Sequence, residues 1–99
     1  MRIIARSTLR NFYSIPEYYD SKKRLEAWWH EAKNADWKTP ADVKAQYGNS
    51  SPIGNNRVVF NICGNKYRLV VEFHYDKGRG YIRFIGTHKD YDEIDAETI

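Results

Sequence analysis

Apolar residues recur along the chain at a helical spacing in the first half and at an alternating spacing in the second. Four apolar residues between positions 21 and 34 follow the i, i+3, i+4, i+7 spacing that places side chains on one face of a helix; they are Leu25, Trp28, Trp29 and Ala32. Asp20 or Ser21 can cap the start of this helix. The pattern therefore predicts a helix that runs to about Asn34 and packs this face on the core.

Three shorter elements are predicted around this helix. Residues 2–5 are apolar enough for a short strand, and residues 8–15 can form about two helical turns before the next proline. Thr39 followed by Pro40 is typical of an N-cap and a first helical position, which predicts a third short helix up to the next glycine. Residues 49–56 are rich in turn formers and lack periodicity, so we expect a loop there.

Alternation in the second half predicts antiparallel strands. The β-rich runs 57–63 and 66–74 flank Gly64-Asn65, a strong signal for a two-residue hairpin turn. The register set by this turn pairs Asn61 with Arg68 and collects the apolar residues on one face. That face, which must meet the helices, carries Val58, Phe60, Ile62, Tyr67, Leu69, Val71 and Phe73.

A further strand is expected after a second turn at Lys77-Gly78. Pairing Phe73 with Ile82 would place Ile82 and Phe84 in the core and Arg83 on the polar face. The implied architecture is α+β, with a small antiparallel-rich sheet of three to four strands packed on one face by two to three helices. The other face, basic and rimmed by aromatic residues, is left for a ligand.

Length and composition narrow the class of protein. The 99 residues are enough for one compact domain, and we expect residues 1–99 to form one. The single cysteine, Cys63, excludes an internal disulfide, and its place in a strand predicts a buried thiol. The N-terminus is too polar for a signal peptide or a membrane span, so we expect a cytoplasmic protein.

Charge is distributed unevenly along the chain. Residues 1–89 hold all 16 Lys and Arg against 8 of the 13 acids, whereas the last ten residues hold the other 5 acids and no base. A basic body favours a polyanionic partner such as nucleic acid. We expect the acidic tail, which begins at about residue 92, to stay away from bound nucleic acid and to pack beside the first helices.

Metal and nucleotide chemistry find little support in the sequence. His30, His74 and His88 lie on different predicted elements, and one cysteine supplies no ligand pair, so we expect no metal site and no cofactor. No glycine-rich phosphate loop opens a helix. His30, within the tryptophan-rich helix, is interpreted as structural.

The remaining residues suit cleavage of an RNA phosphodiester, which needs a cation for the crowded phosphate and a side chain that moves protons. Arg68 on the polar face is the best candidate cation, unless it is a surface or Glu72-paired arginine. His88 is the best proton-transfer group, because histidine exchanges protons near neutral pH. Tyr91 can stack on a base or donate to phosphate, or its ring can simply pack over the sheet edge.

Further polar residues are candidates for contacts to the RNA, with ordinary solvation as the alternative for the lysines; they are Lys44, Asn61, Lys66, Arg83 and Lys89. Arg57 and Arg83 flank Glu72 in the predicted register. A structural ion-pair cluster is therefore at least as good an interpretation of Arg83 as RNA contact.

Three stretches of the chain, residues 37–47, 59–70 and 81–92, resemble HigB toxins of the RelE-like superfamily. The resemblance is carried by FN-x-x-GN-x-[YL]-R, here Phe60–Arg68, and by THK-x-YD, here Thr87–Asp92. It covers roughly residues 3–95. The acidic end of the chain departs from relatives that end in a basic tail.

The resemblance implies a RelE-like fold and an mRNA endonuclease that commonly acts on the ribosome. It also implies a helix-turn-helix antitoxin of the HigA type that neutralises the toxin and represses the operon. By position, Arg68 matches the arginine of the central strand, and His88 and Tyr91 match the polar cluster after the last strand. We therefore expect metal-independent cleavage through 2′-OH attack. The alternative is a non-catalytic nucleic-acid-binding or regulatory module that uses the same basic face.

Overall fold

The protein folds into one sheet and four α-helices, and the computed structural model describes residues 1–99. The helices are α1 (Arg6–Tyr13), α2 (Lys22–Asn34), α3 (Pro40–Gln46) and α4 (His88–Asp92). The strands are β1 (Arg2–Ile4), β2 (Ser51–Ile53), β3 (Arg57–Ile62), β4 (Tyr67–His74) and β5 (Arg79–Thr87). This confirms the predicted α+β class. None of the helices combines the length and apolarity that crossing a bilayer requires.

The five strands form a mixed sheet in the order β1-β5-β4-β3-β2. Only the β1–β5 pair is parallel, so the sheet is antiparallel-rich as predicted. It has five strands rather than three or four. The additional strand, β2, lies within segment 49–56, which the sequence predicts as a loop, and it pairs with β3 from Ser51 to Ile53.

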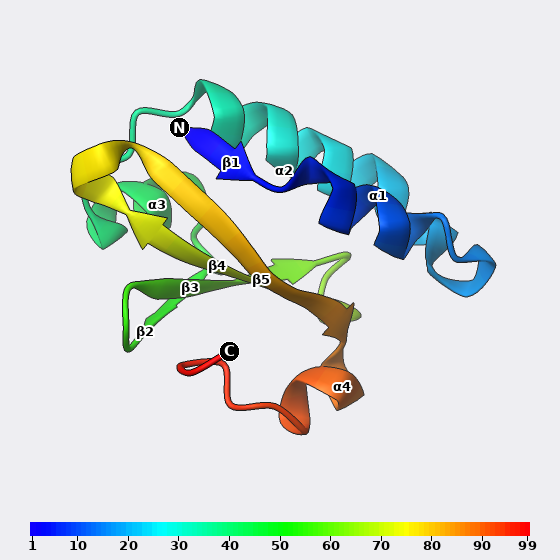
Figure 1. Cartoon of the computed structure of the whole chain (residues 1–99). Helices are drawn as coiled ribbons and strands as arrows, with labels where there is room; N and C mark the ends of the chain where they lie inside the picture. The colour runs from blue at the N-terminus through cyan, green and yellow to red at the C-terminus, as the bar shows by residue number, and fades with distance from the viewer.

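Helices cover one face of this sheet. Buried residues of α1, α2 and α3 pack in one core with the inward residues of β3 and β4; Trp28, for example, meets Phe60 edge-on with ring centroids 5.3 Å apart. Figure 1 shows α4 and the C-terminus on the opposite side of the sheet from α1 and α2. We call the sheet face away from α1 and α2 the outer face.

The helix predictions hold in their main features. Thr39 forms a capping box with Asp42 at the start of α3. Ser21 occupies the N-cap position of α2, but its hydroxyl donates to the Tyr18 carbonyl at 2.6 Å and makes no capping hydrogen bond, so the predicted side-chain cap of α2 is wrong. Helix α1 begins at Arg6, two residues before the predicted start. Trp29 is half-buried at the margin of the core rather than within it, and its ring lies 4.1 Å under the Arg6 guanidinium.

The β3–β4 hairpin has the predicted register but a different turn. Asn61 pairs with Arg68 as expected. Pairing ends at Ile62 and Tyr67, and the backbone takes positive φ values of 54° at Cys63 and 68° at Gly64. A four-residue loop keeps the same side-chain alternation as the predicted two-residue turn, so the register survives. The prediction of a buried strand thiol is wrong, since Cys63 lies in the loop and is half-buried.

The β4–β5 pairing differs from the prediction. Val71 pairs with Ile82 and Val70 with Phe84, so a β-bulge leaves Arg83 as the extra residue on β5. The bulge changes the alternation. Ile82 still packs on the main core, but Phe84 lies on the outer face, and its predicted core position is wrong.

The C-terminal tail, residues 93–99, crosses the outer face. Ala96 is buried against Val59 and Val70, with Ile94 and Phe84 packed around them. The tail therefore does not pack beside the first helices, contrary to the prediction. The bulge explains the difference, because Phe84 extends the apolar strip of Val59 and Val70 and gives the apolar residues of the tail a surface to cover.

Candidate active site

Helix α4 is fixed beside the start of β4. Thr87 caps it, accepting from the Asp90 backbone N–H at 3.1 Å, while the Asp90 carboxylate accepts from the Thr87 N–H at 3.4 Å. The backbone N–H of His88 donates to the carbonyl of Lys66 at 3.2 Å. The first turn of α4 is thus held against the β3–β4 loop.

The Asp92 carboxylate orients His88. Its Nδ1 lies 3.1 Å from Oδ2 of Asp92, one helical turn later. Because a carboxylate only accepts hydrogen bonds, Nδ1 carries the hydrogen in this contact. The other ring nitrogen, Nε2, is then available to take up or release a proton, and the side chain is about half exposed.

Arg68 lies next to α4 on the outer face. It sits between Asn61 on β3 and Gly86 on β5. The only hydrogen bond of its side chain runs from Nη1 to the Asn65 carbonyl at 3.3 Å, and the guanidinium pairs with no carboxylate. Most of its guanidinium is therefore free to bind an anion.

Gly86 permits the close packing at this point. A Cβ atom here would lie 2.6 Å from the ring of Phe84 and 3.3 Å from Cβ of Asp90. The absence of a side chain lets α4 and the Phe84 ring lie directly over the β5 position that pairs with Arg68. The candidate cation, Arg68, and the candidate proton-transfer group, His88, therefore lie at the same end of the outer face.

Tyr91 is half-buried beside them. Its ring is tilted against that of Phe84, with centroids 6.3 Å apart, and it borders the outer cluster of Val59 and Val70. Its hydroxyl forms no hydrogen bond within the protein. The Tyr91 ring therefore packs over the sheet, as one of the two predicted alternatives has it, while its hydroxyl stays available to a ligand.

Two of the lysines predicted to contact RNA are already engaged elsewhere. Lys66 forms an ion pair with Asp20, which also accepts from the Tyr67 hydroxyl at 2.6 Å. Hydrogen bonds from Lys66 and Tyr67 hold the pKa of Asp20 below its ordinary value. Lys44 donates to the Ser50 carbonyl at 2.7 Å.

The other predicted contacts are divided between the two ends of the outer face. Asn61 lies beside Arg68, and Lys89 is exposed on α4. Arg83 lies at the opposite end, where its Nε and Nη2 each lie 2.9 Å from the Glu72 carboxylate.

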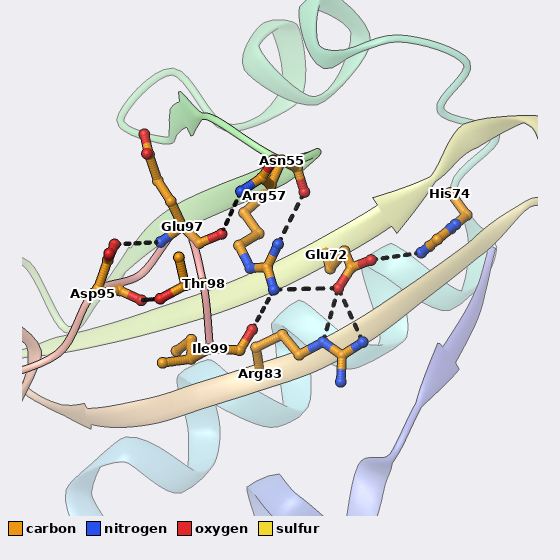
Figure 2. Close-up of polar contacts among 9 residues, drawn as sticks. All are labelled: Asn55, Arg57, Glu72, His74, Arg83, Asp95, Glu97, Thr98 and Ile99. Carbon is orange, nitrogen blue, oxygen red and sulfur yellow. Dashed lines mark hydrogen bonds and ion pairs between the residues drawn. The ribbon is translucent and has the colours of Figure 1, made fainter.

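Glu72 is the centre of this second cluster. Besides Arg83, its carboxylate lies 2.8 Å from Nε2 of His74 and 3.5 Å from Nη2 of Arg57 (Figure 2). Burial alone raises the pKa of Glu72, but the hydrogen bonds from His74 and Arg83 and the charges of Arg83 and Arg57 outweigh it and lower the pKa. The ion-pair interpretation of Arg83 is therefore the one that the geometry supports.

The C-terminal tail closes the outer face at the Glu72 cluster. Arg57 donates to the backbone oxygen of Ile99, and the Asn55 amide donates to the Glu97 carbonyl at 2.7 Å (Figure 2). The Glu97 carboxylate also accepts from the Gly54 N–H at 3.1 Å. At the opposite end, His88 stays exposed and Arg68 half-buried. A ligand of the outer face therefore has access to the Arg68 end.

Nowhere in the chain do three or more His, Cys, Asp or Glu side chains converge as a set of metal ligands. The site at the Arg68 end offers a cation, an imidazole, a phenol and an amide. These groups bind anions and move protons.

A family model places the chain among known proteins. The model of HigB toxins, described as the RelE-like toxic component of a toxin–antitoxin system, matches residues 21–94, well over half of the chain. The chain belongs to the HigB family.

Curated relatives of this HigB-family chain come from enteric bacteria. The mRNA interferase toxin HigB of Escherichia coli K12 is 28% identical over 98 residues, which cover 97% of this chain and 92% of the relative. The mRNA interferases HigB of Escherichia coli O157:H7 and of Shigella flexneri match to the same extent. The family match spans α2 to α4 and therefore includes Arg68, His88 and Tyr91.

Sequence reasoning missed two features of this HigB-family site. Asp92, which holds His88, could have been found from its i, i+4 spacing on a helical segment. The tail contact of Arg57 could not, because it depends on where residues 93–99 lie in space.

Proposed function

We propose that the protein is the toxin of a type II toxin–antitoxin pair and cleaves mRNA by attack of the RNA 2′-OH on its own phosphate. The observation that carries this proposal is the placement of Arg68 and the His88–Asp92 pair at one accessible end of the outer face. Support also comes from family membership and from relatives named mRNA interferases.

The proposed reaction needs only groups of the RNA and of this chain. The 2′-oxygen forms a bond to phosphorus, and the bond from phosphorus to the 5′-oxygen breaks, which leaves a 2′,3′-cyclic phosphate and a 5′-OH. Arg68 stabilises the additional negative charge on the phosphate in the transition state. His88 Nε2 or the Tyr91 hydroxyl takes the 2′-OH proton or protonates the leaving oxygen. No step requires a metal ion.

Asp92 acts as a positioning residue in this scheme. It holds Nδ1 of His88 and so fixes the tautomer that leaves Nε2 free. Asp92→Asn should lower kcat more than it raises KM. When the asparagine NH₂ donates to Nδ1 of His88, the ring must carry its hydrogen on Nε2, which is the other tautomer. Equal kcat for Asp92→Asn and wild type would remove this role. A ¹⁵N spectrum of the His88 ring reports the tautomer directly.

The proposed partners are mRNA on the ribosome and a helix-turn-helix antitoxin of the HigA type. We expect the antitoxin to present acidic residues to the basic body of the toxin, since complementary charge speeds association and makes it salt-sensitive. An association rate that does not change with salt would contradict this expectation.

The decisive experiment is cleavage of a defined mRNA by the protein alone in EDTA and by the protein with ribosomes in a magnesium buffer, because EDTA dissociates ribosomes. Wild type should cleave in EDTA, and His88→Ala should abolish cleavage while remaining folded. His30→Ala is the matched control, since His30 is an exposed histidine on α2. RNA binding without cleavage under any of these conditions would favour the non-catalytic nucleic-acid-binding module instead.

A further inference from the structure

A groove runs between α2 and the end of the β3–β4 hairpin. Its volume is about 560 Å³, within the range of small-ligand sites. Lys23, Arg24 and Ala27 of α2 line one side, and Asn61 and Cys63 line the other. None of these residues except Asn61 belongs to the site described above.

The carboxylates of this groove already have partners. Asp20 is bound by Lys66 and Tyr67, and Glu31 accepts from the Tyr47 hydroxyl at 2.9 Å. Lys66 compensates the charge of Asp20, whereas Glu31 forms no ion pair and keeps its negative charge, so its part of the groove suits a neutral base rather than a phosphate.

The free polar groups of the groove are cations and amides. Lys23 and Arg24 are exposed and take part in none of the ion pairs of the chain. Asn61 uses only its amide nitrogen, which lies 3.3 Å from the Asn49 carbonyl, and the Asn49 side chain has no partner. Such amides offer both donors and acceptors, which is what the edge of a nucleobase requires.

The groove lies on the α2 side of β3, and Asn61 at the strand edge connects it with the Arg68 end of the outer face. Asn61 lines the groove and pairs directly with Arg68 across one strand spacing, about 4.8 Å. Strand β2 pairs with β3 only as far as Val59, and beyond it the Asn61 side chain reaches the Asn49 carbonyl at 3.3 Å, so polar side chains rather than strand pairing form the edge of β3 here. An RNA strand with a phosphate at Arg68 can therefore turn its next base over this edge.

We propose that this groove binds one unstacked nucleobase of the RNA strand, next to the phosphate held by Arg68. The amides of Asn49 and Asn61 contact the base edge, and Lys23 and Arg24 contact the flanking phosphate. This proposal rests on the proposed function and names the part of the substrate that sets its sequence preference.

The observations favour RNA over a docked helix of the antitoxin. A docked amphipathic helix requires a run of apolar pockets for its i, i+3, i+4 and i+7 side chains. The exposed large apolar residues of this chain, Ile15 and Tyr19, do not line the groove. The free groups in the groove are polar or basic instead.

The only cysteine of the chain provides a direct test, because Cys63 lines the groove. The probe is single-stranded RNA of mixed sequence with 2′-O-methyl riboses, which binds but cannot be cleaved by 2′-OH attack. Burial raises the pKa of Cys63, so alkylation by iodoacetamide is followed at mildly alkaline pH. Saturating RNA should largely abolish alkylation, because an occupied groove excludes the reagent from the Cys63 thiol.

A matched pair of variants separates groove binding from general effects. Ala27→Trp fills the groove, whereas Ala45→Trp makes the same substitution at an exposed position of α3 outside it. Only Ala27→Trp should abolish the RNA protection of Cys63 and flatten the base preference next to the cut in cleavable mRNA. Ala45→Trp should match wild type in both measurements.

Several outcomes would overturn the proposal. Alkylation of Cys63 at the same rate with and without RNA removes the base site even if the protein cleaves mRNA. Protection by the purified antitoxin but not by RNA would make the groove a protein-docking site. Failure of the proposed function is a separate result, since it appears as absent cleavage of unmodified mRNA, whereas the alkylation rate reports binding alone.

Discussion

Replacing Glu72 by glutamine should destabilise the fold, because it leaves a buried arginine without an opposing charge. The Glu72 side chain is 16% exposed and the Arg57 side chain 10% exposed, and their charged groups lie 3.5 Å apart. Glutamine keeps the shape of Glu72 but removes its negative charge. Arg57 then keeps only its hydrogen bonds to the backbone oxygens of Asn55 and Ile99.

The magnitude follows from the geometry of the pair. Two unit charges 3.5 Å apart attract by roughly 5 kcal/mol at an effective dielectric constant of about 20. Desolvation offsets part of this, and removing one partner of a buried pair typically costs about 3–5 kcal/mol. Arg83 is 41% exposed, so its pairing contributes about 1 kcal/mol or less. We expect Glu72→Gln to cost about 3 kcal/mol and the control Arg83→Gln about 1 kcal/mol or less.

Urea unfolding followed by tryptophan fluorescence measures these free energies. A double-mutant cycle with Arg57→Met tests the cause, since the cost of Glu72→Gln should fall by about half or more once the buried cation is gone. A loss below about 1 kcal/mol for Glu72→Gln, or the same loss in both backgrounds, would refute the reasoning.

Stability should also depend on pH through the same carboxylate. The pKa of Glu72 is lower in the folded protein than its ordinary value. Its contribution is therefore complete above the unfolded-state value of about 4.3 and is lost as pH falls through the lower folded value. Acidification below about pH 4 should destabilise wild type more than Glu72→Gln. Parallel stability curves for the two proteins would contradict this.

Three further predictions concern the outer face. Arg68→Ala should reduce mRNA cleavage about 100-fold or more, because the transition state loses a hydrogen-bond donor. The control Arg79→Ala, at an exposed position, should leave cleavage unchanged. Unchanged cleavage by a folded Arg68→Ala variant would remove the role of Arg68. Thr87→Ala should cost about 1 kcal/mol in urea unfolding by removing the α4 cap, and a cost near zero would mean that β5 alone holds α4. Deleting residues 94–99 should preserve or slightly raise cleavage, because it removes negative charge. The same deletion should lower the thermal midpoint, because it exposes Val59 and Val70. A folded truncated protein that loses cleavage would place the tail in the active site.

Local signals in the sequence predict most of the fold. The periodicity of Leu25 and Trp28 predicts α2, and Thr39-Pro40 predicts α3, because helix faces and caps are determined within a few residues. The β3–β4 register is also predictable, since the alternation of apolar residues permits only one buried face.

The β5 register could not be predicted in the same way. Residues 79–87 have aromatic and apolar residues at both odd-numbered and even-numbered positions, that is, on both faces of a regular strand. The sequence pattern therefore fits a regular strand as well as a bulged one. Only the packing of Phe84 over Gly86 and Val70 distinguishes the two. The parallel addition of β1 likewise depends on contacts between distant segments.

For the candidate site, motif and spacing identify which residues gather but not which of them are free. Arg68 and Lys66 are equally basic in the sequence, yet Asp20 engages Lys66 and no carboxylate engages Arg68. The partner of Lys66 lies 46 residues earlier in the chain. Availability of a charge is therefore a property of the folded molecule.

The bulge at Arg83 and the position of the tail have one physical origin. Turning Phe84 outward enlarges the apolar strip of Val59 and Val70 on the outer face, and burying that surface favours a covering segment. Ile94 and Ala96 supply it, so apolar contacts rather than charge alone hold an acidic segment on a basic sheet. The tail then ends at Arg57 and closes that half of the face, which leaves the Arg68 end, between α4 and the edge of β3, as the accessible path for an RNA strand.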